Sequence, residues 1–296
     1  MRFKSGFVTI IGRPNVGKST LLNKLTGEKV AITSNRPQTT RNTIKTIVTD
    51  EDSQIVFIDT PGIHKPQNKL GEYMVNAANE AFNNVDVVLF LVDAEDKKPG
   101  LGDKYIIERF KRSKTPVFLV INKIDLVSKE LLLSAIDMYN QEYGFKATIP
   151  ISAKNNDGID ILHKEIKNIL PKGPKYFEDD MLTDQPEKHI VSEIVREKIL
   201  RLIQDEIPHG VGVEVTKFKE RTDKDILDID INIYCEKDTH KGIIIGKHGS
   251  MLKKIGTLAR EDVEKFLDTK VFMQLWVKVK PDWRNSDYML KNLGYK

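Results

Sequence analysis

Residues 12–19 read GRPNVGKS, and this stretch decides the fold of the first half of the chain. It matches the phosphate-binding pattern G-x-x-x-x-G-K-[ST] at every fixed position, between an apolar run at 7–11 and a helical-looking segment at 19–25. In this strand–loop–helix context, glycines let backbone N–H groups turn inward around a phosphate at a helix N-terminus, where anions are favoured. Lys18 can bridge the β- and γ-phosphates, and the Ser19 hydroxyl can ligate Mg²⁺. The stretch therefore predicts a nucleotide-binding loop, the alternative being a glycine-rich turn that merely carries a lysine.

From Phe7 to about Leu170, apolar runs of strand type alternate with amphipathic helical segments. The expected strands are 7–11, 44–49, 55–59, 85–92, 117–121 and 148–151, and the expected helices lie near 18–25, 70–82, 102–112, 129–142 and 158–169. This alternation predicts an α/β domain with a mostly parallel six-stranded sheet covered on both faces. Only residues 50–54 join the second and third strands, so this pair should form a hairpin with one antiparallel edge strand.

The bulk composition excludes several classes of protein. It is 40% hydrophobic and 30% charged, as in soluble globular proteins. The longest apolar run, Val87–Val92, is far shorter than the roughly 20 residues that span a bilayer. The N-terminus has no apolar signal core, and the lone cysteine, Cys235, cannot form an internal disulfide. We therefore expect a cytoplasmic protein, and a length of 296 residues allows about two domains.

Three further motifs follow expected strands, at the edge of the sheet where such folds bind ligands. In Asp59-Thr60-Pro61-Gly62, Asp59 can hold Mg²⁺ through water, and the Gly62 N–H can contact a γ-phosphate and lose it after hydrolysis. In residues 122–125, NKID, the acceptor-only Asp125 carboxylate matches the N1–H and N2-amino donors of guanine, which adenine lacks.

The remaining base contacts come from the same motif and from residues 152–154, SAK. Asn122 can position the loop, the Lys123 stem can pack on the base, and the SAK backbone can donate to guanine O6. All four motifs in this order favour GTP over ATP. The predicted GTP-binding residues are Gly12, Arg13, Pro14, Asn15, Val16, Gly17, Lys18, Ser19, Thr20, Asp59, Thr60, Pro61, Gly62, Asn122, Lys123, Asp125, Ser152, Ala153 and Lys154.

A second domain follows a stretch that is rich in proline, glycine and acidic residues. The predicted limits are 1–172 for the nucleotide-binding domain, 173–186 for the linker and 187–296 for the second domain. The second domain reads helix, strand, strand, helix, helix, strand, and residues 239–260 within it carry five Lys or Arg side chains and no acidic one.

The turn Gly246-Lys247-His248-Gly249 is the second chemical signal. A GxxG turn lets a nucleic-acid backbone approach closely, and an adjacent apolar platform suits single-stranded bases. The other interpretation is a glycine-bounded turn between two helices. The element order resembles the type II KH domain, an α+β fold that binds single-stranded RNA. The predicted RNA contacts are Lys241, Ile243, Ile244, Ile245, Gly246, Lys247, His248, Gly249, Lys253 and Lys254.

Taken together, GRPNVGKS, PQTTRN, DTPGIHKP, NKID and SAK resemble the translation-factor-related class of GTPases and, within it, the Era family, over the whole chain. Among Thr39 and Thr40, the resemblance implies Thr40 as the switch ligand of Mg²⁺, and it implies a K⁺ held by Asn15. Ile63 stands where Ras-type GTPases carry a Gln that orients water, so intrinsic hydrolysis should be slow. The predicted catalytic residues are Lys18, Thr40 and Gly62, and the predicted Mg²⁺ ligands are Ser19, Thr40 and Asp59.

The resemblance also implies partners. It implies binding near the 3′ end of 16S rRNA during assembly of the small ribosomal subunit. From the nucleotide motifs we expect a GTP/GDP switch in which GTP orders loops 33–42 and 60–70 and hydrolysis releases them. The resemblance further implies loose peripheral contact with the inner face of the cell membrane, and we expect the protein to be a monomer. Three alternatives stay open: a GTPase coupled to tRNA modification, a membrane signalling GTPase whose KH-like domain binds a protein, and an RNA-binding scaffold with structural GTP.

Overall fold

The computed structural model describes residues 3–27, 40–61, 66–82, 84–96, 98–204 and 207–295. The chain forms two compact units. The first comprises Met1–Lys65 and Met74–Asp184, and the second comprises Pro66–Tyr73 and Gln185–Lys296. None of the helices within the described ranges is both long enough and apolar enough to cross a membrane.

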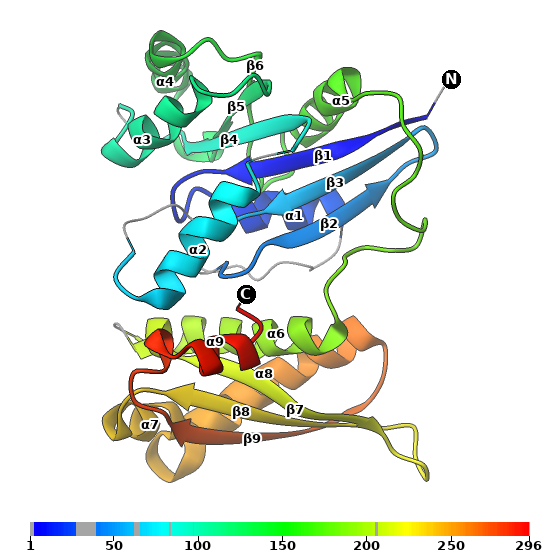
Figure 1. Ribbon diagram of the computed structural model, residues 1–296, viewed down its shortest axis with the longest axis vertical. Helices are drawn as coiled ribbons and strands as arrows, with labels where there is room; N and C mark the ends of the chain where they lie inside the picture. Colours follow the sequence, from blue (N-terminus) through cyan, green and yellow to red (C-terminus); the bar gives the residue numbers. More distant parts are fainter. Residues whose placement is uncertain are drawn as a thin grey trace. The chain divides into compact units, whose positions relative to one another are not determined.

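The first unit is built on a six-stranded sheet with the strand order β2-β3-β1-β4-β5-β6 (Figure 1). Its strands are β1 Lys4–Ile11, β2 Ile44–Thr49, β3 Ser53–Asp59, β4 Val87–Asp93, β5 Val117–Asn122 and β6 Ala147–Pro150. The pair β2–β3 is antiparallel and every other pair in the sheet is parallel, which confirms the predicted fold class and hairpin. The carboxyl ends of β1, β3, β4 and β5 therefore meet at one edge, where the predicted motifs begin.

Helices cover both faces of this sheet, as Figure 1 shows. The helices are α1 Lys18–Thr26, α2 Lys69–Glu80, of which Met74–Glu80 belongs to this unit, α3 Leu101–Phe110, α4 Lys129–Glu142 and α5 Ile159–Ile169. Leu21 of α1 and Leu162 of α5 belong to one buried cluster with the sheet, whereas Ile106 of α3 and Tyr139 of α4 belong to another. Both faces are thus dry, which explains why β3 and β5 are buried along their whole length.

Part of the segment predicted as a linker, residues 173–186, is bound along the hairpin edge of the first unit. The amide of the buried Gln54 fastens it, because Oε1 accepts the N–H groups of Tyr176 and Phe177 at 2.7 and 3.0 Å, and Nε2 donates to the Phe177 carbonyl at 2.9 Å. Further on, the Ile47 N–H donates to the Leu182 carbonyl at 2.9 Å. These contacts hold the segment to β3 and to the edge strand β2, and an ion pair between Lys45 of β2 and Asp184 at 3.1 Å extends them to 184.

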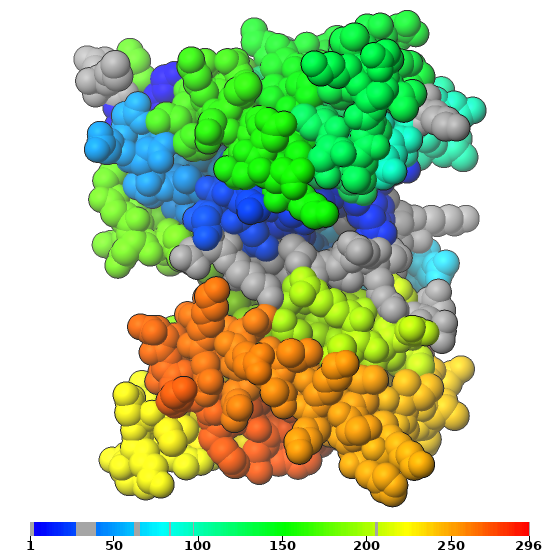
Figure 2. Space-filling model, turned by 180° about the vertical axis from the view of Figure 1, so that it is seen from behind, coloured from blue at the N-terminus to red at the C-terminus, as the bar shows by residue number. Residues whose placement is uncertain are grey.

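The second unit has a three-stranded sheet in the order β7-β8-β9, with helices packed against it. Its elements are α6 Glu187–Leu202, β7 Gly212–Glu220, β8 Leu227–Cys235, α7 Asp238–Ile245, α8 Ser250–Leu267, β9 Val271–Val279 and a terminal α9 Asp287–Asn292. β8 pairs antiparallel with β7 and parallel with β9, so the predicted α-β-β-α-α-β order is confirmed. Figure 2 shows α7, the turn after it and α8, drawn in golden and orange tones, together on one face of this unit.

Candidate functional site

The phosphate loop joins β1 to α1 in a path that its glycines make possible. A Cβ at Gly12 would lie 2.3 Å from the Leu91 carbonyl oxygen, and one at Gly17 would lie 2.2 Å from Asn122 Nδ2. Gly17 also has a φ of +101°, in the left-handed region that L side chains rarely adopt. Neither position accommodates a side chain. The predicted residues 12–20 form one continuous loop and the first turn of α1.

Lys18 is folded over this loop. Its Nζ donates to the carbonyl oxygens of Gly12 and Arg13 at 3.1 and 3.0 Å. Burial lowers the pKa of Lys18 to about 8, although the nearby Asp59 carboxylate acts in the opposite direction. The ammonium is therefore held where loop and helix meet, in a place where phosphate oxygens would restore its ordinary pKa.

Three oxygen-bearing side chains from distant parts of the sequence meet beside Lys18. The Ser19 Oγ lies 3.1 Å from Thr40 Oγ1, and these hydroxyls lie 3.2 and 3.0 Å from Asp59 Oδ2. Asp59 is fully buried, and burial raises the pKa of its carboxyl group. Its Oδ1 is buried with no hydrogen-bond partner in the described parts of the chain. An orphaned carboxylate oxygen beside two hydroxyls fits Mg²⁺, a cation that prefers oxygen ligands and can be reached through water.

The guanine motifs are tied to the loop by Asn122. Its Nδ2 donates to the Val16 carbonyl at 2.8 Å, and its Oδ1 accepts the Ala153 N–H at 3.0 Å. The Ser152 hydroxyl donates to Asp125 Oδ1 at 2.6 Å, which orients the carboxylate. The Asn122 side chain thus links the phosphate loop, the NKID motif and the SAK motif. Ser152 of the SAK motif positions the Asp125 carboxylate, which is predicted to read the base.

For several predicted residues, the part of the chain that the structure describes shows no side-chain contact that supports the predicted role. Gly62 and Ile63 lie outside the described residues, so their roles stay predictions. The Thr60 hydroxyl donates to the Ile10 carbonyl at 2.9 Å, which leaves its backbone as the part that can meet a nucleotide. Asn15 is exposed and has a φ of 67°, and its role toward K⁺ is likewise still a prediction.

Sequence reasoning missed two acidic residues that support the site. Asp93, the last residue of β4, forms an ion pair with Lys123. The rule that finds ligands at strand ends would have found Asp93, because it directly follows Val87–Val92. Asp103, in α3, forms an ion pair with Arg13 at 2.9 Å. No local pattern marks Asp103, because an acid in the first turn of a helix is common on any solvated surface.

In the second unit, the predicted GxxG turn separates α7 from α8. Gly246 and Gly249 have φ values of 75° and 76°, and a Cβ at Gly246 would lie 2.8 Å from the Met251 nitrogen. Lys247 and His248 are exposed between them. The turn therefore presents two cationic or polar side chains on a backbone that only glycines can follow, as a phosphate clamp requires.

The apolar platform predicted beside this turn needs one correction. Ile243 is 49% exposed, but Ile244 is fully buried in the hydrophobic core of the unit and Ile245 is half-buried. Successive residues of a helix point about 100° apart, so three isoleucines in a row cannot share a surface. The prediction that Ile244 offers its side chain to bases is therefore wrong. Lys253 and Lys254 are exposed on α8, as the RNA-binding hypothesis requires.

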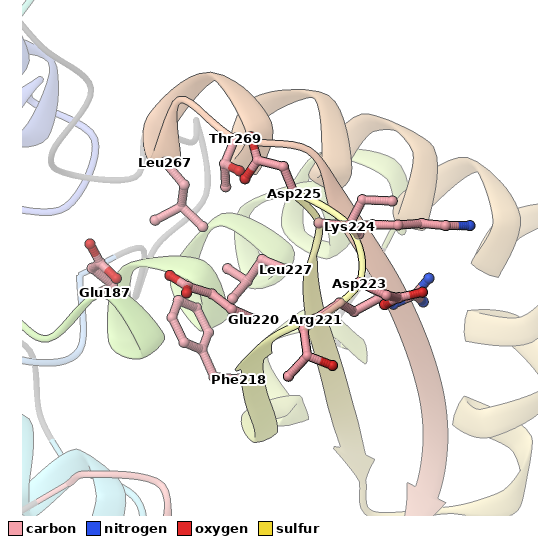
Figure 3. Close-up of a pocket in the computed structure, with 12 residues that line it drawn as sticks. Glu187, Phe218, Glu220, Arg221, Asp223, Lys224, Asp225, Leu227, Leu267 and Thr269 are labelled. Atoms are coloured by element: carbon pink, nitrogen blue, oxygen red, sulfur yellow. The ribbon is translucent and has the colours of Figure 1, made fainter.

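A separate cavity of about 570 Å³ lies in the second unit around the β7–β8 connection (Figure 3). It is lined by Glu187, Phe218, Glu220, Arg221, Thr222, Asp223, Lys224, Asp225, Ile226, Leu227, Leu267 and Thr269. Four of these are carboxylates. The Arg221 guanidinium is engaged by Asp228, at 2.7 Å from Nε, and lies 4.9 Å from the centre of the Phe272 ring. This lining is poorly suited to a phosphate, and the cavity includes neither glycine loop.

The comparisons with known proteins agree with this geometry. Residues 7–123 match the family model of the 50S ribosome-binding GTPases, and residues 206–284 match the KH domain model. GTPase Era of Ruminiclostridium cellulolyticum is 62% identical over 296 residues, which cover 100% of this chain and 99% of that protein. GTPase Era of Clostridioides difficile is 58% identical over 99% of both chains.

Two solved structures are similar over nearly the whole chain. One is Era in complex with MgGDPNP and nucleotides 1506–1542 of 16S ribosomal RNA, with a TM-score of 0.96 and 39% identity over 99% of both chains. The other is a variant of Aquifex aeolicus Era bound to GDP·AlF4⁻, with a TM-score of 0.95, the same identity and the same coverage. With both domains, all four nucleotide motifs and full-length relatives in agreement, the chain belongs to the Era family of GTPases.

Proposed function

We propose that this chain is a GTP-hydrolysing switch that binds the 3′ region of 16S rRNA and acts in assembly of the small ribosomal subunit. The observation that carries the proposal is the meeting of Ser19, Thr40 and Asp59 beside Lys18 in a chain that also presents a GxxG turn. A similar protein was solved with MgGDPNP and nucleotides 1506–1542 of 16S rRNA, so both ligands are of the kind that these two sites fit.

The chain's own residues hold the nucleotide in named ways. Lys18 moves its ammonium from the carbonyl oxygens of Gly12 and Arg13 to the β- and γ-phosphates, while backbone N–H groups of the loop surround the β-phosphate. Ser19, Thr40 and Asp59 would hold Mg²⁺, which when bound neutralises charge on the phosphate oxygens. No general base is required of them, because positioning and charge stabilisation supply most of the catalysis in phosphoryl transfer.

Hydrolysis by water should be slow without an activator or a monovalent cation, and Asn15 would hold that cation. Asn15 is exposed and has a positive φ in the phosphate loop, and both features are compatible with that role. We expect GTPase activity to be higher in KCl than in NaCl for the natural protein, and the Asn15→Ala variant to lose that difference. A rate that is the same in both salts for the natural protein would remove K⁺ from the mechanism.

The location and state of the protein belong to the same proposal. We propose a cytoplasmic monomer in loose contact with the inner face of the cell membrane. Its domains have limits near 1–172 and 187–296, and the joining segment, 173–186, is bound to the first domain as far as 184. The family resemblance supports the membrane contact, and the composition of the sequence supports the location and the domain limits. Fractionation of cell lysates tests the location, and sedimentation of the pure protein at several concentrations tests the oligomeric state. Recovery only in an integral membrane fraction, or a stable dimer, would contradict them.

Crosslinking the protein to RNA in living cells, followed by sequencing of the attached RNA, tests the proposed partner. Reads should accumulate at the 3′ end of 16S rRNA. A Lys253→Ala/Lys254→Ala variant should lose most of these reads while it keeps GTP binding, because both exposed lysines lie on α8 beside the turn. Enrichment of tRNA, or of no RNA at all, would favour the tRNA-linked or the protein-binding alternative instead.

A further inference from the structure

The side chain of Arg13 leaves the phosphate loop and turns toward α3. Its Nε donates to Asp103 Oδ1 at 2.9 Å, and its guanidinium also pairs with Asp96. Its backbone carbonyl, in contrast, stays in the loop and accepts the Lys18 ammonium at 3.0 Å. One residue therefore connects the group that will bind phosphate with a helix outside the nucleotide motifs.

Asp103 is built into this place by several donors. It is fully buried, and its Oδ2 accepts the Gly100 N–H at 3.0 Å and the Tyr139 hydroxyl at 3.2 Å. Tyr139 comes from α4 and is itself buried, and burial raises the pKa of its hydroxyl, which keeps the hydroxyl protonated as a donor. A buried carboxylate is tolerated only when it is paired with a cation and hydrogen-bonded. The Arg13 guanidinium supplies the cation that Asp103 needs here.

The start of α3 is also shaped to let the arginine stem pass. A Cβ at Gly102 would lie 3.0 and 3.2 Å from Cδ and Cγ of Arg13, and one at Gly100 would lie 3.8 Å from its Nη1. Gly102 is the second residue of α3 and lies in its first turn. Gly102 therefore leaves room for the Arg13 stem at the start of α3, next to the Asp103 carboxylate.

We propose that Asp103, held by Tyr139, is a positioning residue that acts through Arg13 to fix the phosphate loop in its nucleotide-binding conformation. Asn15 and Gly17 both have positive φ values, so the path of the loop is one that requires support from its surroundings. The arginine anchor fixes the carbonyl oxygens that hold Lys18 before a nucleotide arrives. The inference rests on the nucleotide site proposed above and adds three residues, Asp103, Tyr139 and Gly102, that the sequence motifs do not contain.

A double-mutant cycle on nucleotide affinity tests this role. Dissociation constants for fluorescent GDP and for a non-hydrolysable GTP analogue would be measured for the natural protein, Asp103→Asn, Arg13→Ala and the double variant. Removing one partner of a charged hydrogen-bonded pair should weaken both nucleotides by about tenfold, and by the same factor, since both contact the β-phosphate side of the loop. The double variant should bind no more weakly than Arg13→Ala, because Asp103 then has no arginine through which to act.

The control is Glu108→Gln, which removes an exposed carboxylate from the same helix and should leave both constants unchanged. Circular dichroism and thermal unfolding, measured on the same variants, show whether the first domain is folded. If Asp103→Asn does not fold, Tyr139→Phe removes a single hydroxyl and should weaken both nucleotides two- to threefold. Unchanged nucleotide affinity in the folded variants, or losses that add in the double variant, would overturn the positioning role. Failure of the natural protein to bind GTP would instead refute the proposed function.

Discussion

The molecule has two glycine-bounded loops, each leading into a helix, and they are built in opposite ways. In the phosphate loop a Cβ at Gly12 or Gly17 would lie within 2.3 Å of a neighbouring atom, and Lys18 is 7% exposed. In the GxxG turn a Cβ at Gly246 would lie 2.8 Å from the Met251 nitrogen, but one at Gly249 would meet nothing within 4 Å, and the two central side chains are exposed. The first loop is organised before its ligand arrives, whereas the second presents an open clamp to a long polymer. Single substitutions should therefore cause large losses of nucleotide affinity at the first loop and small losses of RNA affinity at the second.

The largest effect is expected at the base-reading carboxylate. In the Asp125→Asn variant the acceptor pair for guanine becomes an acceptor and a donor, which matches xanthine instead. The ratio of affinities for GTP and xanthosine triphosphate should shift by roughly 10⁴, as buried polar mismatches do. Competition binding with both nucleotides measures this ratio. Unchanged GTP selectivity would mean that the base contact is misassigned, and that Ser152 orients the Asp125 carboxylate for some other purpose.

A methyl group in the phosphate loop should have the next largest effect. In Gly12→Ala the new Cβ would lie 2.3 Å from a backbone carbonyl oxygen, which cannot move without displacing β4. We expect nucleotide affinity to fall by about 100-fold or more, with RNA binding by the second domain retained. Gly144→Ala is the matched control, because a Cβ there meets nothing within 4 Å. Equal behaviour of the two variants would contradict the crowded, organised loop described here.

Proton uptake on binding GDP should be a smaller effect than either substitution, but a measurable one. Lys18 has its pKa lowered to about 8 by burial, and phosphate oxygens should raise it again. GDP binding therefore takes up a proton when Lys18 of the free protein is partly deprotonated. The affinity for GDP should fall as pH rises through about 8, by at most tenfold per pH unit. Calorimetry in two buffers of different ionisation enthalpy should show more uptake at pH 8.5 than at pH 7. No difference between these pH values would show that Lys18 is already fully charged in the empty site.

The open clamp should respond in small steps. Contact with about five phosphates gives a log–log salt slope for single-stranded RNA near −3.5, at about 0.7 for each phosphate. The Lys253→Ala/Lys254→Ala variant should reduce the slope by about 1.4, and Lys104→Ala, on α3 of the first unit, should not change it. Titrations at several salt concentrations measure the slope. A flat response in the natural protein would remove the basic face of α7 and α8 from RNA binding.

Residues at strand ends could be predicted from sequence because the chemistry there is local. A loop pattern, a strand before it and a helix after it determine where Lys18, Asp59 and Asn122 lie, and the structure brings all of them to one edge. The second unit was predictable for a similar reason. Its order of elements follows from alternating periods of two and 3.6 residues, and its turn follows from paired glycines.

What could not be predicted depends on partners far away in the sequence. β1 begins at Lys4 rather than Phe7, because its polar first residues pair with Ser53 and Gln54 of β3. The segment after 172 reads as a free linker, yet Gln54 holds its backbone from more than 120 positions away. Asp103 reads as one acid among many on a helix until the arginine that it meets is known. Long-range pairing of this kind leaves no local periodicity.

One measurement tests the central claim that the first loop controls the second. The affinity for an RNA oligonucleotide of the 16S 3′ end would be measured with a non-hydrolysable GTP analogue bound and again with GDP bound. A switch requires different affinities, by fivefold or more, and the RNA must then change the ratio of nucleotide affinities by the same factor. Equal RNA affinities in the two nucleotide states would contradict the account, and would leave a GTPase and an RNA-binding domain that share a chain without controlling one another.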